Sequence, residues 1–265
     1  MASETRAIAG QSPATITELR RSDKWWAEPL AAASVLVLFF IYSTWRMLEH
    51  KYWRVEGSGL EVHYLSPFYA LPDFGIKFLT YPVIAAAYAL FIPIGFRGTC
   101  YFCRRTYYRA LFGDPSACAV PEAIKRPAYT GEKSFPWVLQ NIHRYTLYLI
   151  AIITVLHWKH LFDAFFFTVD GSTKFGIGVG TLLLALDTVL LTLYVGSCHS
   201  FRHLIGGFVN LFSSKQTQYK MWKGVTALNA RHGLFFWLSL ASIWLADLYI
   251  RLVYSHAITD LHFHL

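Results

Sequence analysis

Five long apolar stretches, separated by polar and charged segments, form the hydrophobic pattern of the 265-residue chain. A helix rises about 1.5 Å per residue, so about 20 apolar residues cross the roughly 30 Å hydrocarbon core of a bilayer. The third stretch exceeds one crossing, and we expect its last turns to extend along the interface. The pattern predicts an all-α fold, an integral membrane bundle of five transmembrane helices at about 30–48, 78–96, 137–167, 175–198 and 232–254.

Polar segments flank and join these spans. Residues 1–27 predict a short N-terminal arm, and no apolar stretch of signal-peptide form precedes the first span. Residues 28–256 make up the predicted transmembrane domain, and residues 257–265 form a short outer tail. Two connecting loops, 97–136 and 199–231, are basic and rich in aromatic residues.

Composition and charge support a membrane protein and give it an orientation. The chain is 55% hydrophobic and only 15% charged, whereas soluble domains have roughly 25% charged residues. Its net charge of +8 is spread between apolar spans, so we interpret it as a topology signal and expect no nucleic-acid partner. Five spans place 17 of the 24 Lys and Arg residues on the side of the N-terminus. The positive-inside rule predicts that this side is cytoplasmic.

All four cysteines lie on the predicted cytoplasmic side, three of them within 98–118 and the fourth, Cys198, at the end of the fourth span. A reducing compartment disfavours a structural disulfide, so metal binding becomes the favoured interpretation of these cysteines. Helix ends of one bundle approach within about 8–10 Å of each other, and their side chains can meet. The thiols and imidazoles expected at this depth are Cys100, Cys103, Cys118, Cys198, His143, His199, His203 and His232.

This pool of donors contains enough of both ligand types for a Rieske-type [2Fe–2S] cluster. Such a cluster has two thiolates on one iron and two imidazoles on the other, which raises its potential toward values suited to quinone reduction. We expect its ligands to be two of Cys100, Cys118 and Cys198 and two of His143, His203 and His232, with Cys103 and His199 as reserves.

Other centres stay open at this point. The interiors of the first, second, fourth and fifth spans contain no histidine, which argues against stacked haems. A single haem b between His143 and His232, or reaching His203, is compatible with the pattern, and so is tetrahedral zinc bound by Cys and His. The simplest alternative is that the cysteines are small core residues that bind nothing.

Asp187 lies near the middle of the fourth span. An unpaired carboxylate in the hydrocarbon core is costly, so an acidic residue there is a candidate for function, in this case as a carrier of protons. The structural alternative is a protonated Asp that hydrogen-bonds between helices. His157, His160 and Asp247 lie toward the outer ends of their spans and could form a polar chain with it.

Three segments resemble a known family: GFRGTCYFCRRTYYRALFGDPSACAV, YTGEKSFPWVLQNIHRYTLYL and GSCHSFRHLIGG. They are similar to the membrane-anchor (cytochrome b-type, SdhC) subunit of succinate dehydrogenase and fumarate reductase complexes, in particular the single five-helix anchor of actinobacterial-type enzymes. The specific resemblance covers about 95–210, and the rest matches only in its five-span pattern.

The resemblance implies a bacterial cell-membrane complex in which a flavoprotein oxidises succinate and an iron–sulfur subunit passes electrons to this chain, which delivers them to a membrane quinone. The two soluble partners would dock on the cytoplasmic face, beside anionic lipid headgroups. Many relatives hold two haems through histidines inside four helices, and those positions are not histidine here. This departure favours another relay, such as the Cys/His cluster.

A quinone pocket should be mostly apolar and aromatic, with a few hydrogen-bond donors. The sequence offers two candidate sets, one beyond the cluster and one near the docking surface, and does not decide between them. A non-redox transporter or scaffold is the rival class of protein. The first set is Trp158, His157, His160 and Asp187, and the second is Tyr145, Arg202 and Trp222.

Overall fold

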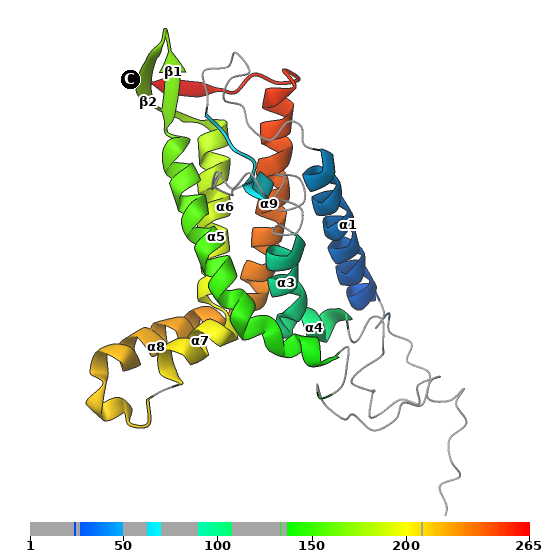
Figure 1. The fold of residues 1–265 in the computed structure, drawn as a ribbon, viewed down its shortest axis with the longest axis vertical. Coiled ribbons are helices and arrows are strands. Elements are labelled where there is room, and N and C mark those ends of the chain that lie inside the picture. The colour runs from blue at the N-terminus through cyan, green and yellow to red at the C-terminus, as the bar shows by residue number, and fades with distance from the viewer. Residues whose placement is uncertain are drawn as a thin grey trace, which may run out of the picture.

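The computed structural model describes residues 27–49, 63–69, 90–107, 137–207 and 209–265, together with Lys24 and Lys133. Most of these residues are helical, and a small sheet closes one end of the molecule (Figure 1). The α-helices are α1 (Ala27–Glu49), α3 (Gly95–Thr99), α4 (Tyr101–Tyr107), α5 (His143–Asp163), α6 (Val179–Gly196), α7 (His199–Gly206), α8 (Gln216–Asn229) and α9 (His232–Tyr254). The strands are β1 (Phe166–Val169), β2 (Ser172–Gly178) and β3 (His262–His264), and short 3-10 or π turns are η1 (Pro67–Tyr69), η2 (Leu90–Ile94), η4 (Trp137–Ile142) and η5 (Phe212–Ser214).

Three helical segments are long and apolar enough to cross a membrane: Val138–Asp163, Val179–Gly196 and His232–Tyr254. They correspond to the third, fourth and fifth predicted spans. The first predicted span falls within α1, whose apolar part, Leu30–Arg46, is shorter. Most of the second predicted span and almost all of the N-terminal arm lie outside the described residues. A mostly helical membrane protein is therefore confirmed, while the count of five spans stays a prediction.

The prediction of helix was wrong only at the facing ends of the third and fourth spans, 164–167 and 175–178, where the structure has a turn followed by a β-hairpin. Strands β1 and β2 pair antiparallel, with Val169 opposite Ser172. The two residues between them, Asp170 and Gly171, have φ of 51° and 74°, as a two-residue hairpin turn with an Asp-Gly pair requires. The predicted tail is also part of the sheet, since β3 pairs with β2. A three-stranded sheet thus interrupts the expected all-α fold.

Helices α5, α6 and α9 run side by side along the long axis, and α1 and α3 lie on the α9 side of this group (Figure 1). We call the end with the strands the sheet end and the opposite end, where α7 and α8 project sideways, the α7 end. Apolar side chains stay exposed on outward faces, for example Val155 at 67% and Leu182 at 60%. Such exposure is expected where helices face lipid rather than water.

A buried ion pair joins α1 to α9 near the sheet end. Arg46 donates from Nε and Nη2 to the two carboxylate oxygens of Asp247, at 2.7 and 3.1 Å. The hydroxyls of Tyr42, at 2.5 Å, and Ser66 donate to the same carboxylate. Asp247 therefore belongs to this structural junction, and the predicted polar chain from Asp247 to Asp187 is not formed by these contacts.

The tail is held by a second carboxylate at the sheet end. Asp260 accepts hydrogen bonds from the Tyr64 hydroxyl at 2.8 Å, the Tyr249 hydroxyl at 2.6 Å and the backbone N–H of Gly180 at 3.1 Å. These donors come from three separate segments of the chain, so one buried carboxylate ties the tail to α6, to α9 and to the segment before η1.

Candidate metal centre and neighbouring cavity

Two cysteines and two histidines meet at the α7 end, where four helices begin or end. Cys100 is the residue after α3 and Cys198 the residue before α7, and both have extended backbone. His143 and His232 are the first residues of α5 and α9. The four side chains come from distant segments, since Cys100 and His232 are 132 residues apart in sequence.

Each thiol lies against one imidazole. The Cys100 sulfur is 3.2 Å from Nε2 of His232, and the Cys198 sulfur is 3.2 Å from Nε2 of His143. The other nitrogen of each ring faces a hydroxyl of the residue beside a cysteine: Nδ1 of His143 is 3.0 Å from Thr99, and Nδ1 of His232 is 2.8 Å from Ser197. Hydroxyl contacts at Nδ1 hold both rings so that Nε2 faces the thiols, as is common for histidines that bind metals.

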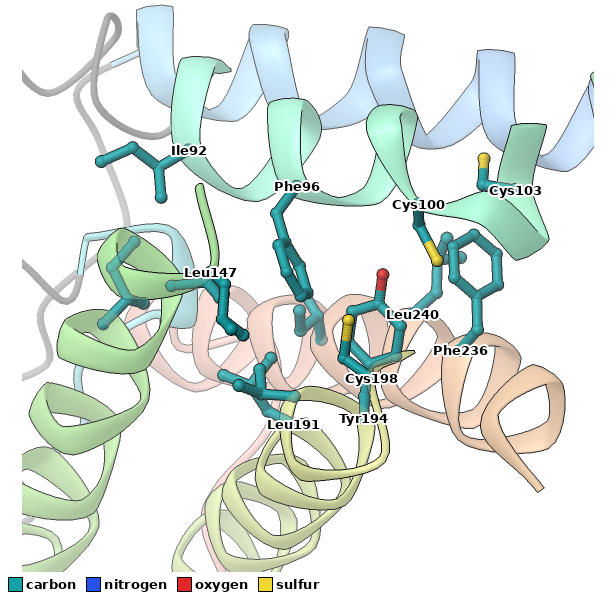
Figure 2. Packing of buried hydrophobic residues seen from close by; sticks show 14 of the residues in the cluster. Ile92, Phe96, Cys100, Cys103, Leu147, Leu191, Tyr194, Cys198, Phe236 and Leu240 are labelled. Atoms are coloured by element: carbon teal, nitrogen blue, oxygen red, sulfur yellow. The ribbon is translucent and has the colours of Figure 1, made fainter. Parts of the chain in front are cut away.

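Aromatic rings cover both imidazoles on the side of the bundle interior. Phe96 stacks on His143 with ring centroids 4.6 Å apart, and Tyr194 stacks on His232 at 5.0 Å. Phe96 and Tyr194 are almost fully buried, and Figure 2 shows them in the same packed core as Cys100 and Cys198. The rings separate the polar site from the interior of the bundle and exclude water from that side.

Burial raises the pKa of both thiols. Burial raises the pKa of the Cys100 thiol, and the backbone N–H groups of Cys103 and Phe102 lower it only in part. Burial and the neighbouring Cys100 raise the pKa of the Cys198 thiol to about 11. Because a metal binds the thiolate, a metal held by these residues would displace their protons and replace the two Cys–His contacts.

The arrangement of the donors distinguishes between metal centres. Among the described residues no three His, Cys, Asp or Glu side chains surround one point as a single metal ion requires. The four donors form two separate Cys–His pairs instead. A mononuclear zinc site needs four ligands around one ion, whereas a Rieske-type cluster divides two thiolates and two imidazoles between two irons. The donor set fits the binuclear cluster better.

The other members of the predicted pool are not part of this group. His203 lies on α7 and is exposed, and His199 is exposed at the start of the same helix. Cys103 is buried on α4, and in Figure 2 its sulfur points away from the Cys198 sulfur. Cys118 lies outside the described residues.

An open pocket of about 820 Å³ gives access to the four donors from the α7 end. Its wall includes all four of them and two basic side chains, Arg104 and Arg231. The centre is therefore buried toward the bundle and approachable from the face predicted to be cytoplasmic.

A second, narrower cavity of about 50 Å³ lies on the other side of the aromatic layer. Phe96 and Tyr194, which stack on the two imidazoles, also line this cavity, so one layer of rings separates it from the donors. The rest of its wall is mostly apolar and comes from η1, η2, α1, α5, α6 and α9. Its polar side chains, apart from the Tyr194 hydroxyl, are Ser43, Arg97 and His157.

Arg97 is the charged residue of this wall, and it is only 4% exposed. Its guanidinium lies 4.6 Å from the Tyr194 ring centroid and donates to the Phe236 carbonyl at 3.1 Å and to the Ser239 hydroxyl at 2.9 Å. Among the described residues no carboxylate forms an ion pair with it. A buried cation without a paired anion is costly, and it leaves strong donors available for a ligand in the cavity.

Of the first predicted set of quinone-binding residues, only His157 lines the narrow cavity. His157 is buried and lines the cavity. Trp158 is 45% exposed and donates to Thr192, and His160 lies 3.9 Å from Asp163 at the end of α5. Asp187 is fully buried but is not in the cavity wall. Its Oδ1 accepts a hydrogen bond from Ser242 at 2.8 Å, and its Oδ2 has no partner among the described residues.

The second predicted set lies on the surface of the α7 end. Arg202 stacks over Trp222 at 4.7 Å and donates to Thr226, which joins α7 to α8. Tyr145 is exposed on α5, under the guanidinium of Arg144. None of these three residues lines either the open pocket or the narrow cavity.

Sequence reasoning did not identify Phe96, Arg97 or Tyr194 as parts of the site. Arg97 was counted only as a positive flank of a span, and the rings were ordinary apolar positions. A usable signal was present in the pairs Thr99-Cys100 and Ser197-Cys198, since each cysteine directly follows a hydroxyl residue. Only the structure shows that these hydroxyls reach the histidines of other helices.

Comparison with known proteins gives two matches. The family described as actinobacterial succinate dehydrogenase subunit SdhC matches residues 27–256, a range that contains all four donors. A chain of the Mycobacterium smegmatis Sdh1 complex in the apo form has a similar structure, with a TM-score of 0.78 and 38% sequence identity, over 92% of this chain and 93% of its own length. No curated protein sequence matches the chain.

Proposed function

This chain belongs to the actinobacterial succinate dehydrogenase SdhC family, and we propose that it relays electrons to a membrane quinone through a Rieske-type [2Fe–2S] cluster. It is the membrane anchor of a succinate dehydrogenase complex. In the proposed arrangement a flavoprotein oxidises succinate, and an iron–sulfur subunit brings the electrons to the α7 end. Both partners dock on the cytoplasmic face of the bacterial cell membrane, where the N-terminus of this chain also lies.

One observation carries the proposal: two buried thiols and two imidazoles meet at the helix ends, with each Nε2 at 3.2 Å from a sulfur. The proposed ligands are therefore Cys100, Cys198, His143 and His232. A cluster of this type supplies a one-electron relay whose potential is raised by its imidazole ligands. Thr99 and Ser197 orient the two rings, and Phe96 and Tyr194 keep water away from the interior side.

The narrow cavity behind the aromatic layer is the proposed quinone site. Its wall is mostly apolar and aromatic. The guanidinium of Arg97, which has no ion-pair partner among the described residues, offers N–H donors to a quinone oxygen. The usual volume of such pockets is about 300–1,000 Å³, so a quinone ring enters only if part of the wall moves. The part of the wall that belongs to short irregular elements consists of Pro67, Phe68, Pro93 and Ile94.

Reduction of a quinone to a quinol consumes two electrons and two protons. Asp187 is the proposed carrier of protons, because its Oδ2 is buried without a partner, as suits a carboxyl group that holds a proton. Ser242 joins it to the cavity, since the Ser242 hydroxyl also contacts the Ser239 carbonyl and the Ser239 hydroxyl binds Arg97.

Removal of single imidazoles from the complete complex tests the cluster. We expect His143→Ala and His232→Ala to abolish the EPR signal of the cluster and quinone reduction, while succinate oxidation by the soluble subunits with an artificial acceptor continues. His203→Ala is the matched control, because His203 lies at the same end but outside the group, and it should retain the signal. Iron and acid-labile sulfide are measured on each complex.

The rival centres give different results in the same preparation. A haem b anchor would show a reduced-minus-oxidised haem spectrum and no acid-labile sulfide beyond that of the partner subunit. A zinc site would bind zinc and show no redox signal. Either result in the wild-type complex overturns the proposed relay.

A further inference from the structure

We propose that the Tyr194 hydroxyl donates a hydrogen bond to the Cys100 sulfur in the loaded site, and that this bond raises the potential of the site. The inference rests on the proposed function and adds a positioning residue to it. Tyr194 is not a ligand in the proposed set. It would act on the electron relay through a ligand sulfur.

The Tyr194 side chain is held without freedom to turn away. Its ring stacks on the His232 imidazole, with centroids 5.0 Å apart and an interplanar angle of 17°, and the Arg97 guanidinium lies 4.6 Å from the ring centroid. Phe96 and Phe236 contact it edge-on at 5.5 and 5.6 Å. A ring enclosed on all these sides keeps its hydroxyl in one direction.

That hydroxyl is buried and has no hydrogen-bond partner among the described residues. Burying a hydroxyl that makes no bond costs free energy, and a Phe of the same shape would avoid this cost. The unused donor is therefore explained if the loaded site provides an acceptor. In Figure 2 the Tyr194 oxygen points toward helices α3 and α4, between which Cys100 lies.

Cys100 is the acceptor that the packing favours. The imidazole under the Tyr194 ring belongs to His232, and Nε2 of that imidazole lies 3.2 Å from the Cys100 sulfur. The sulfur of a neutral thiol is a weak acceptor. A metal-bound thiolate carries negative charge, and hydrogen bonds to charged acceptors are about twice as strong as neutral ones.

The bond changes the redox properties in one direction. Reduction places more negative charge on the sulfurs, so a donor to a sulfur stabilises the reduced state more than the oxidised state. Hydrogen bonds to the sulfurs are among the factors that set the potential of iron–sulfur centres. Tyr194 therefore makes the relay easier to reduce.

Tyr194→Phe in the intact complex tests the proposal, because Phe keeps the stacked ring and removes only the oxygen. We expect about a tenfold smaller equilibrium constant for reduction, which is a fall of about 59 mV for a one-electron couple. The midpoint potential is measured by redox titration of the EPR signal. Tyr148→Phe, on the exposed face of α5, is the matched control and should leave the potential unchanged.

An unchanged potential in Tyr194→Phe, with the cluster present, overturns the proposal and leaves the relay itself standing. Absence of any cluster signal in the wild-type complex overturns the relay and this inference with it. If Tyr194→Phe does not assemble, wild-type complex labelled with 3-fluorotyrosine replaces it. Fluorinated phenols are more acidic and donate more strongly, so the potential should rise, and a constant potential would contradict the proposed bond.

Discussion

Both ends of the bundle contain buried polar side chains, but the two ends differ in whether these side chains have partners. At the sheet end the charges are matched. Arg46 and Asp247 pair through two contacts, Arg46 also donates to Glu49 at 2.7 Å, and Arg251 donates to both oxygens of Glu49 at 2.5 and 2.9 Å. Asp260 has three donors of its own. Each of these charged side chains has at least one partner of its own.

From the middle of the bundle to the α7 end, several buried polar groups lack partners among the described residues. The Arg97 guanidinium has no ion-pair partner among the described residues, and the Tyr194 hydroxyl and Asp187 Oδ2 have no hydrogen bond there. The thiols and imidazoles of the candidate centre face one another across 3.2 Å. Each of these groups would gain a partner if a metal centre, a quinone or a proton were present.

This difference distinguishes polar groups that stabilise the fold from polar groups that bind a ligand, and it does so without reference to any relative. A network that is already satisfied stabilises the fold and has no capacity left for a ligand. A set of buried groups that lack partners lowers stability, so its presence is best explained by what it binds. Removing a group should therefore reduce stability most at the sheet end and reduce activity most at the α7 end.

The largest effect on stability is expected for Asp247→Ala. It leaves the Arg46 guanidinium buried without its main partner, and breaking a buried pair in this way costs about 3–5 kcal/mol. We expect loss of α1 docking, seen as a lower yield of assembled complex and a lower temperature of unfolding. Tyr42→Phe is the control, since it removes one donor from the same carboxylate and should cost only about 1 kcal/mol. Equal stability of Asp247→Ala and wild type would contradict the role given to the sheet end.

Arg97→Gln, in the wall of the narrow cavity, should reduce activity strongly and stability only slightly. Loss of a single donor to a developing negative oxygen typically lowers turnover about 10²–10³-fold, and we expect an effect of about 10²-fold on quinone reduction. Stability should change by less than about 1 kcal/mol, because a buried charge without a carboxylate partner contributes little to folding. Succinate–quinone turnover and thermal unfolding are measured on the same complex. Arg97→Lys keeps the charge without the planar donors, so its turnover should lie between those of wild type and Arg97→Gln.

Asp187→Asn asks whether the buried carboxyl group carries protons. The amide keeps the shape and an oxygen that can accept the Ser242 hydroxyl, so assembly should be normal. General acid–base groups contribute about 10²–10⁴-fold to rates. Because Asp187 does not line the cavity, we expect a smaller effect, about a tenfold loss of succinate–quinone turnover. Unchanged turnover in a fully assembled complex would assign Asp187 to helix packing alone.

The sequence predicted which segments form the spans and which residues lie at the same depth in the membrane. Hydropathy located the three described spans, and topology counting placed Cys100, Cys198, His143 and His232 at one depth. It placed His203 there equally, because depth along a helix does not say which way a side chain points around it. The narrowing from a pool of donors to four required the packing of α3, α5, α6 and α9.

The errors have equally local causes. The apolar run Phe165–Phe167 continues the hydrophobic pattern of α5, so hydropathy extended the helix through it, although the Asp170-Gly171 pair is a strong hairpin signal. Asp247 was considered for a polar chain with Asp187 because its partner, Arg46, lies about two hundred residues earlier in the chain. Long-range pairing of this kind has no periodic signature in a single sequence.

The smallest effect is expected for Lys159→Gln, which breaks an ion pair on the surface of α5. Lys159 and Asp163 are 2.5 Å apart, closer than Arg46 and Asp247 at 2.7 Å, yet their side chains are 65% and 45% exposed instead of fully buried. Exposed pairs contribute about 0–1 kcal/mol, because water already solvates both charges. Thermal unfolding and quinone reduction should both stay close to wild type. A loss comparable to that of Asp247→Ala would mean that contact distance, and not burial, determines which ion pairs hold this bundle together.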